Sequence, residues 1–252
     1  MRITHVIKKS LKKVSLFGTS ALLVVSLASP AMAAAVPSTA STSTTVILIA
    51  GGYGTPELTG QEFGSKFCTG NYHCQDFTYA NYGYSSENQD AANSLDTVLH
   101  KTTGPVLVFG QSEGALVIDA WLRDHDHDAN APSPSQVSFL LTGNTEREYT
   151  GYQTVNKNLN GFVCTASGCG LPADTPYNVT DFCSQWDGWC DWTTDYRSSY
   201  GQTWVHDYYS TVNYDNPANI SWQEGKVTYV NSPTASLDYS WWPDTVNTAH
   251  PY

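Results

Sequence analysis

The chain has 252 residues, with 12 lysines and arginines against 23 aspartates and glutamates, and a formal net charge of −11 at pH 7 with histidine neutral. So acidic a surface is repelled at long range by nucleic acids and anionic membranes, and we expect neither as a partner. The length is sufficient for one sizeable core, and no linker or internal repeat divides the sequence.

The first 33 residues have the pattern of a secretory signal peptide. Five basic residues come first, namely Arg2, Lys8, Lys9, Lys12 and Lys13. The apolar stretch 16–28 that follows is shorter than the ~20 residues that span a bilayer, and Ala31-Met-Ala33 is a small-residue cleavage site. We therefore expect a signal peptide over 1–33, a flexible leader over 34–45 and one exported domain over 46–252, with no stable membrane insertion after cleavage.

The order of apolar runs and helical patterns predicts an α/β domain with a central, mostly parallel sheet flanked by helices. Thr44–Ala50 is an uninterrupted β-rich apolar run, as expected for a strand buried on both faces. Ser86 and Gln89 fit a capping box that opens a helix ending at Leu99. Further strands are expected at 105–109, 137–142 and 177–182, and a second helix at 115–122. The polar, glycine-rich stretch 144–176 fits a loop excursion beside the active-site edge.

The segment Gly110-Gln-Ser-Glu-Gly114 lies between the apolar run Pro105–Phe109 and the helical pattern Ala115–Leu122. In this strand, turn, helix context, Gly-x-Ser-x-Gly is the pattern of a nucleophile elbow, which exposes a serine Oγ above the sheet. Both glycines are needed because side chains there would collide with the neighbouring helix and strand. We predict Ser112 as a catalytic nucleophile, the alternative being an ordinary turn with a surface serine.

Gly51-Gly-Tyr-Gly-Thr55 follows the first strand, at the end of the sheet where ligands bind in such folds. Its glycines let backbone N–H groups turn toward a pocket. We predict an oxyanion hole made by the N–H of Glu113, which follows the serine, and that of Gly52 or Tyr53. The alternative is a phosphate-binding loop or a plain turn, but a phosphate loop needs a nearby lysine or a Gly-Lys-Ser/Thr sequence, and neither is present.

Six cysteines form three closely spaced pairs: Cys68 with Cys74, Cys164 with Cys169, and Cys183 with Cys190. An exported chain meets an oxidising environment, so three local disulfides are the natural interpretation, although the sequence cannot choose among the possible pairings. Zinc ligation is the alternative. The spacings contain no repeated Cys-x-x-Cys and no clustered histidine, so we expect no metal at these cysteines.

Asp187 lies in the loop Cys183–Cys190, just after a predicted strand and in the chain position of the acid of a Ser, Asp, His triad. A disulfide across so short a loop would hold Asp187 in place, as suits an acid that orients an imidazole and stabilises its charged form. Three neighbouring carboxylates are rivals on spacing alone, namely Asp181, Asp191 and Asp195. Triad logic favours Asp187.

His206 follows the acid, as this triad order requires, and we predict it as the general base. His250 also follows Asp187, but it lies two residues from the chain end. His125 and His127 belong to the run Arg123-Asp-His-Asp-His-Asp128, which has the composition of a metal cluster. A solvated, charged helix end is the better interpretation because the run lacks the geometry of a known cation loop, so we expect no metal or cofactor.

Five blocks of the chain together resemble the PE-PPE C-terminal hydrolase domain, a cutinase-like branch of the α/β hydrolases. They are Gly51–Pro56, Gly110–Ala115, Leu141-Thr-Gly-Asn144, Gln185-Trp-Asp-Gly-Trp189 and Val205-His-x-x-Tyr209. The fourth and fifth are the specific ones. The resemblance implies a cutinase-like fold, an esterase acting on acyl esters, and Ser112, Asp187 and His206 as its triad.

Two departures from the family pattern affect what the resemblance implies. A secretion signal is expected where the family has its PE or PPE segment, so any inherited export route or partner does not carry over. Cysteines bracket the acid, in an arrangement similar to the Cys-x-x-x-Asp-x-x-Cys loop of cutinases, and this strengthens Asp187.

The sequence thus predicts a secreted, monomeric serine hydrolase whose substrate is an acyl or lipid ester. An acyltransferase is one alternative, because a sugar hydroxyl that replaces water would receive the same acyl group. A binding module for glycans or lipids is another, since the chain has 8 tryptophans and 16 tyrosines that could form aromatic platforms. A binding module would not need a serine on an elbow with an acid and a histidine in triad order.

Overall fold

A computed structural model of the chain describes residues 43–83, 85–155, 168–185, 187–192, 206 and 209–233. All of them belong to one compact unit, which spans residues 40–252. The predicted signal peptide and most of the predicted leader lie outside the described residues. The last two leader residues, Thr44 and Thr45, are already in the first strand, where their N–H groups donate to Asn71 O and Pro105 O.

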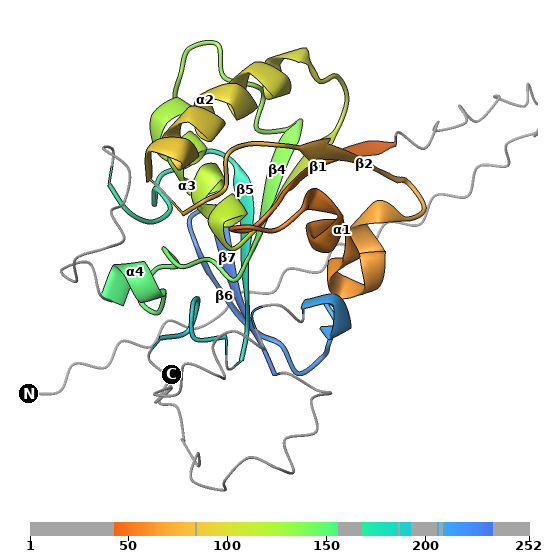
Figure 1. Cartoon of the computed structure of the whole chain (residues 1–252), viewed down its shortest axis with the longest axis vertical. Coiled ribbons are helices and arrows are strands. Elements are labelled where there is room, and N and C mark those ends of the chain that lie inside the picture. Colours follow the sequence, from red (N-terminus) through yellow and green to blue (C-terminus); the bar gives the residue numbers. More distant parts are fainter. Residues whose placement is uncertain are drawn as a thin grey trace, which may run out of the picture. The chain divides into compact units, whose positions relative to one another are not determined.

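The described residues form a seven-stranded sheet in the order β2-β1-β3-β4-β5-β7-β6 (Figure 1). Its strands are β1 (Thr44–Ile49), β2 (Tyr72–Phe77), β3 (Val106–Gln111), β4 (Val137–Thr142), β5 (Asn178–Ser184), β6 (Ile220–Glu224) and β7 (Val227–Ser232). Every neighbouring pair is parallel except β6 with β7. The predicted central, mostly parallel sheet is confirmed.

Helices cover both faces of this sheet. They are α1 (Pro56–Ser65), α2 (Ser85–Lys101), α3 (Glu113–His125) and α4 (Tyr152–Val155), with the 3₁₀ turns η1 (Lys66–Cys68) and η2 (Tyr209–Thr211). Figure 1 shows α2 and α3 against one face and α1 against the other. No helix within the described ranges combines the length and the apolar character that a membrane span needs.

Alternate strand residues supply two cores, one on each face of the sheet. In β1, Ile47 and Ile49 belong to the core under α2 and α3, whereas Val46 and Leu48 belong to the core under α1. Burial on both faces explains why 44–50 is a continuous apolar run instead of an alternating one. The α1 side is rich in aromatic side chains, and Phe63 contacts five of them: Phe67, Phe109, Phe182, Tyr209 and Tyr214.

The predicted strands correspond to β1, β3, β4 and β5, and the two predicted helices to α2 and α3. The predicted capping box is wrong. Helix α2 already includes Ser86, so this residue is not the N-cap, and the Gln89 side chain donates to Asp124 of α3 instead of returning to its own helix terminus. A contact between helices therefore replaces the local one.

Candidate active site

Ser112 connects β3 to α3 in strained backbone, with φ 54° and ψ −116°. A Cβ at Gly110 would lie 2.4 Å from Gly114 O, and one at Gly114 would lie 2.4 Å from Ile49 O. Both positions exclude a side chain, as the elbow pattern predicts. The half-buried serine thus stands at the carboxyl end of a central strand.

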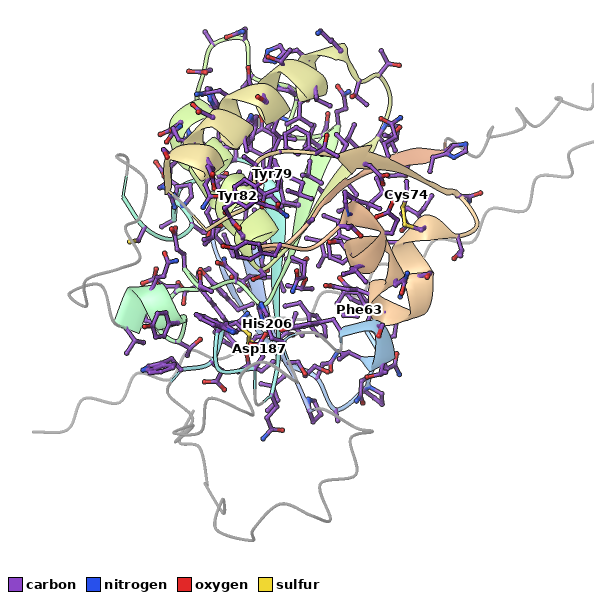
Figure 2. The ribbon with its side chains drawn as sticks, in the orientation of Figure 1. Phe63, Cys74, Tyr79, Tyr82, Asp187 and His206 are labelled. Carbon is purple, nitrogen blue, oxygen red and sulfur yellow. A yellow bond between two sulfur atoms is a disulfide. The ribbon has the colours of Figure 1, made fainter. Side chains whose placement is uncertain are left out.

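Asp187 and His206, which are 19 residues apart in sequence, meet in the interior (Figure 2). The imidazole Nδ1 lies 3.0 Å from Asp187 Oδ2 and 3.1 Å from Oδ1. The carboxylate is fully buried and the histidine nearly so. A hydrogen bond that water barely reaches has little competition from solvent, so this contact orients the ring firmly.

Residues 142 and 143 connect the serine to this pair. The Ser112 N–H donates to Thr142 O at 2.8 Å. A Cβ at Gly143 would lie 2.6 Å from His206 Cε1 and 3.0 Å from Asp187 Oδ2. The end of β4 therefore contacts the Ser112 backbone on one side and the Asp187–His206 pair on the other. Gly143 is required both for its φ of 58° and for the space that a side chain would take from the imidazole.

The loop after β1 lies beside the serine, since a Cβ at Gly51 would come within 3.0 Å of Ser112 Cβ. Asn81 holds this loop, because its Nδ2 donates to Gly51 O at 2.7 Å and to Gly54 O at 3.1 Å. The Asn81 carbonyl also accepts the Tyr53 N–H at 2.9 Å. That bond occupies the Tyr53 N–H, which leaves Gly52 as the candidate oxyanion donor of this loop.

Glu113 is a buried acid immediately after the serine. Its Oε1 accepts the Gly83 N–H at 3.0 Å, and its Oε2 has no hydrogen-bond partner among the described residues. Burial raises the pKa of Glu113 to about 7, although the Gly83 hydrogen bond acts in the opposite direction. A carboxyl group with one donor and no cation to balance it is therefore largely protonated below neutral pH.

Glu62 is a second buried acid near the site, and no sequence pattern pointed to it. The Thr142 hydroxyl donates to Glu62 Oε2 at 2.7 Å. Helix α1 is interrupted here, with Phe63 at φ 54° and Gly64 at φ 63°, and this kink turns Glu62 inward. Burial raises the pKa of Glu62 well above its usual value, and the charge of Asp187 raises it further.

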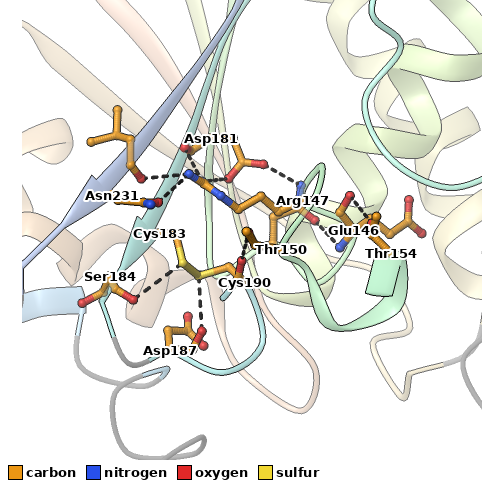
Figure 3. A network of polar contacts seen from close by, with 12 residues as sticks. Glu146, Arg147, Thr150, Thr154, Asp181, Cys183, Ser184, Asp187, Cys190 and Asn231 are labelled. Carbon is orange, nitrogen blue, oxygen red and sulfur yellow. Dashed lines mark hydrogen bonds and ion pairs between the residues drawn. A yellow bond between two sulfur atoms is a disulfide. The ribbon is translucent and has the colours of Figure 1, made fainter. Parts of the chain in front are cut away.

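The rival carboxylate Asp181 has a different set of contacts (Figure 3). Arg147 donates to Asp181 Oδ1 and to the Asp181 carbonyl, both at 2.6 Å. Arg147 also donates to Asn231 at 2.7 Å and is fully buried. Asp181 is thus the partner of a buried arginine and does not contact the histidine. The rival Asp191 is buried, and its N–H donates to the Asp187 carbonyl at 2.9 Å. The rivals Asp195 and His250 lie outside the described residues.

Two of the predicted disulfides are confirmed, Cys68–Cys74 and Cys183–Cys190, with Cα–Cα distances of 5.4 and 5.8 Å. Cys169 is also disulfide-bonded, whereas its predicted partner Cys164 lies outside the described residues. The Cys183–Cys190 bridge closes the loop that carries Asp187. Within this loop the Trp189 N–H donates to Asp187 Oδ1 at 3.0 Å, so the backbone also holds the carboxylate.

A further contact to Asp187 comes from Tyr209, whose hydroxyl donates to Oδ2 at 2.7 Å. A sequence signal for this residue exists, because it is the tyrosine of the His-x-x-Tyr block, but its role was not predicted. Asn81 had no such signal. Its contacts with the glycine loop join segments about 30 residues apart in the chain, and no local pattern encodes them.

Comparisons with known proteins give one family match. The family model described as PE-PPE domain matches residues 74–240, more than half of the chain. Among solved structures, a cutinase-like protein from Cryptococcus sp. aligns with 15% identity and a TM-score of 0.42, covering 67% of this chain and 93% of that one.

Two curated proteins of Mycobacterium tuberculosis match short segments. SL1278 acyltransferase Chp1 is 39% identical over 51 residues, which are 20% of this chain and 13% of that protein. Diacyltrehalose acyltransferase Chp2 is 36% identical over 55 residues, which are 22% of this chain and 15% of that protein. The matched segment is therefore a small part of either relative.

Proposed function

Since this chain belongs to the PE-PPE domain family, we propose that it is a secreted serine hydrolase of acyl or lipid esters, with Ser112, His206 and Asp187 as its triad. The observation that carries the proposal is the buried Asp187–His206 pair, which lies against Gly143 next to the residue that binds the Ser112 N–H. The proposed acid and base adjoin Gly143, and the serine on strained backbone adjoins Thr142, which supports a shared site at the carboxyl end of β4.

In the first half-reaction, Ser112 Oγ attacks the ester carbonyl while His206 Nε2 accepts the hydroxyl proton. The contact of Nδ1 with Asp187 supports this assignment, because a ring whose Nδ1–H donates to a carboxylate has Nε2 as its basic nitrogen. The carboxylate then stabilises the imidazolium that forms. The proton goes from Nε2 to the leaving alcohol, which departs as the acyl-enzyme forms.

The N–H groups of Glu113 and Gly52 bind the negative oxygen of the tetrahedral intermediate. Glu113 is the first residue of α3, so its N–H has no intrahelical acceptor and lies at the positive end of the helix dipole. Gly52 N–H has no hydrogen-bond partner in the described part of the chain, and Asn81 fixes the loop around it. Loss of one such donor typically costs on the order of 10²–10³ in kcat.

The second half-reaction decides between hydrolysis and transfer. Water that is activated by His206 releases the fatty acid, whereas a sugar hydroxyl in its place would give an acylated sugar. Acyl transfer is the second candidate function because both curated relatives are named as acyltransferases, one of them as a diacyltrehalose acyltransferase.

The proposed export agrees with the cysteine chemistry. Disulfides persist in oxidising compartments, and both Cys68–Cys74 and Cys183–Cys190 are closed. We propose that cleavage after Ala33 releases a monomeric domain. Mass spectrometry of the secreted protein would test both the cleavage site and the bridges.

The decisive experiment compares the purified secreted protein with Ser112→Ala in two assays, labelling by a fluorophosphonate probe and turnover of a p-nitrophenyl acyl ester. The wild type should be labelled and active, and the variant should lose both while its melting temperature stays close to that of the wild type. Product analysis with and without trehalose then separates free acid from acyl sugar. Turnover by Ser112→Ala would refute the serine-hydrolase proposal, and a wild type that the probe does not label would favour a binding module.

A further inference from the structure

Tyr209 is fully buried, and its hydroxyl lies at the centre of the loop that carries Asp187. It donates to Asp187 Oδ2 at 2.7 Å and accepts the Ser184 N–H at 3.0 Å. The Cys190 sulfur lies 3.4 Å from the same oxygen. One hydroxyl thus contacts the beginning, the middle and the end of the loop 184–190.

The chemistry of a buried phenol suits this position. Burial and the charge of Asp187 raise the pKa of Tyr209 well above its usual value, so the hydroxyl keeps its proton and remains a donor at neutral pH. A hydroxyl can donate one hydrogen bond, and here the Asp187 carboxylate accepts it. The Ser184 N–H supplies the matching donor to the hydroxyl oxygen, which leaves neither group unsatisfied in the interior.

Asp187 Oδ2 is shared between Tyr209 and the imidazole Nδ1. The donors come from one short stretch of chain, since His206 and Tyr209 are three residues apart. The stretch that supplies the base therefore also supplies the group that fixes the acid. Any movement of the Asp187 loop relative to this stretch would break both contacts together.

We propose that Tyr209 is a positioning residue of the catalytic acid: its hydroxyl sets the orientation of the Asp187 carboxylate toward His206. The inference rests on the proposed triad and adds a fourth residue to it. The disulfide and the hydroxyl then have different tasks. Cys183–Cys190 joins the two ends of the loop, whereas Tyr209 fixes the carboxylate between them.

Tyr209→Phe is the natural test because it removes only the hydroxyl. The ring keeps its contacts with Phe63 and Phe182, at centroid distances of 6.3 and 6.4 Å. We expect kcat to fall about tenfold with KM unchanged, which is a loss of about 1.4 kcal/mol of transition-state stabilisation. The loss should be much smaller than that of Asp187→Asn, for which about 10⁴-fold is expected in a triad.

Tyr177→Phe is a matched control. Tyr177 is also fully buried and its hydroxyl donates to a backbone carbonyl, Pro132 O, but it belongs to the core on the other face of the sheet. The two phenylalanine variants should lose similar stability, while only Tyr209→Phe should lose turnover. All rates are divided by the active-site concentration from fluorophosphonate titration, so a misfolded fraction does not lower the measured kcat.

A double-variant cycle separates positioning from general destabilisation. In the Asp187→Asn background, Tyr209→Phe should reduce kcat no further, because the carboxylate that it orients is gone. Normal kcat for Tyr209→Phe beside an inactive Asp187→Asn would overturn the inference and leave the triad intact. Full activity of Asp187→Asn would instead refute the proposed triad itself.

Discussion

Gly143→Ala tests how tightly the end of β4 is fitted against the proposed triad. The new methyl group would lie 2.6 Å from His206 Cε1 and 2.8 Å from Nδ1. Unbonded carbon atoms are at their optimum at about 3.5–4.0 Å, so the imidazole must retreat by about 1 Å to admit the methyl group. A displacement of that size in a catalytic group lowers the rate on the order of a hundredfold.

The substitution also has a backbone cost, which must be measured separately. Gly143 has φ 58°, where an alanine costs about 1–2 kcal/mol of folding free energy. Gly70→Ala is the matched control, because Gly70 has φ 66° and nothing within 4 Å of the position of its Cβ. Gly70→Ala should lower the free energy of unfolding by a similar amount, and residue 70 does not contact the site.

The assay is steady-state hydrolysis of a p-nitrophenyl ester well below the melting temperature of each variant. Gly143→Ala should lower kcat on the order of a hundredfold, and Gly70→Ala should leave it unchanged, although both lower the melting temperature. Equal kcat values for these two variants would show that His206 does not need its observed position, which would refute the geometric reasoning.

Two further predictions concern the surroundings of the site. The double variant Cys183→Ser/Cys190→Ser should lower kcat more than Cys68→Ser/Cys74→Ser, because only the Cys183–Cys190 bridge closes the Asp187 loop. Equal losses of kcat in the two double variants would contradict this prediction. Burial raises the Glu113 pKa from 4.5 to about 7, so folding favours the protonated form and stability is lost as pH rises through this interval. Glu113→Gln should therefore raise the melting temperature at pH 8 and not at pH 4; an equal effect at both would refute the titration.

The parts of the fold that the sequence predicted are those with a strong local pattern. Central strands such as β1 are buried on both faces and appear as continuous apolar runs. Strands β2, β6 and β7 are missing from the prediction. β2 and β6 lie at the two edges of the sheet, and β7 lies between β5 and β6 with buried residues that alternate with partly buried ones from Val227 to Val230. β2 carries polar residues, Tyr72-His-Cys-Gln-Asp-Phe77, and in β6 Ile220 is 60% exposed, so neither shows the signal of a buried strand.

Helix α1 was missed for a different reason. Its sequence contains two glycines, and its dihedral angles are not helical from Glu62 to Gly64. Propensity argues against a helix there, whereas the kink lets Phe63 enter the aromatic cluster of the α1 side. Tertiary packing thus decides the conformation of this segment, and a single sequence does not reveal it.

The candidate site also contains residues that a local pattern predicts and residues that only tertiary contacts position. The elbow at Ser112 is a local structure, and the order of serine, acid and base along the chain favours Asp187 and His206 for the proposed triad, although Asp191, Asp195 and His250 fit the same order. The contacts that fix these groups are not local. Gly143 and Tyr209 are near their partners only because the carboxyl ends of β4 and β5 lie side by side, with His206 and Tyr209 packed against them.

The three acids near the proposed oxyanion hole differ in the number of donors that they receive. Within the described residues, Asp187 accepts hydrogen bonds from Trp189 N, Tyr209 Oη and His206 Nδ1, whereas Glu62 and Glu113 each accept one. Donors stabilise a carboxylate and burial without them favours its protonation, so the pKa values of Glu62 and Glu113 are raised. An oxyanion that forms within a chain of net charge −11 would be opposed by further negative charges nearby. The raised pKa values of Glu62 and Glu113 favour their neutral forms and so reduce the negative charge that would oppose the oxyanion, whereas Asp187 is the carboxylate that contacts the imidazole.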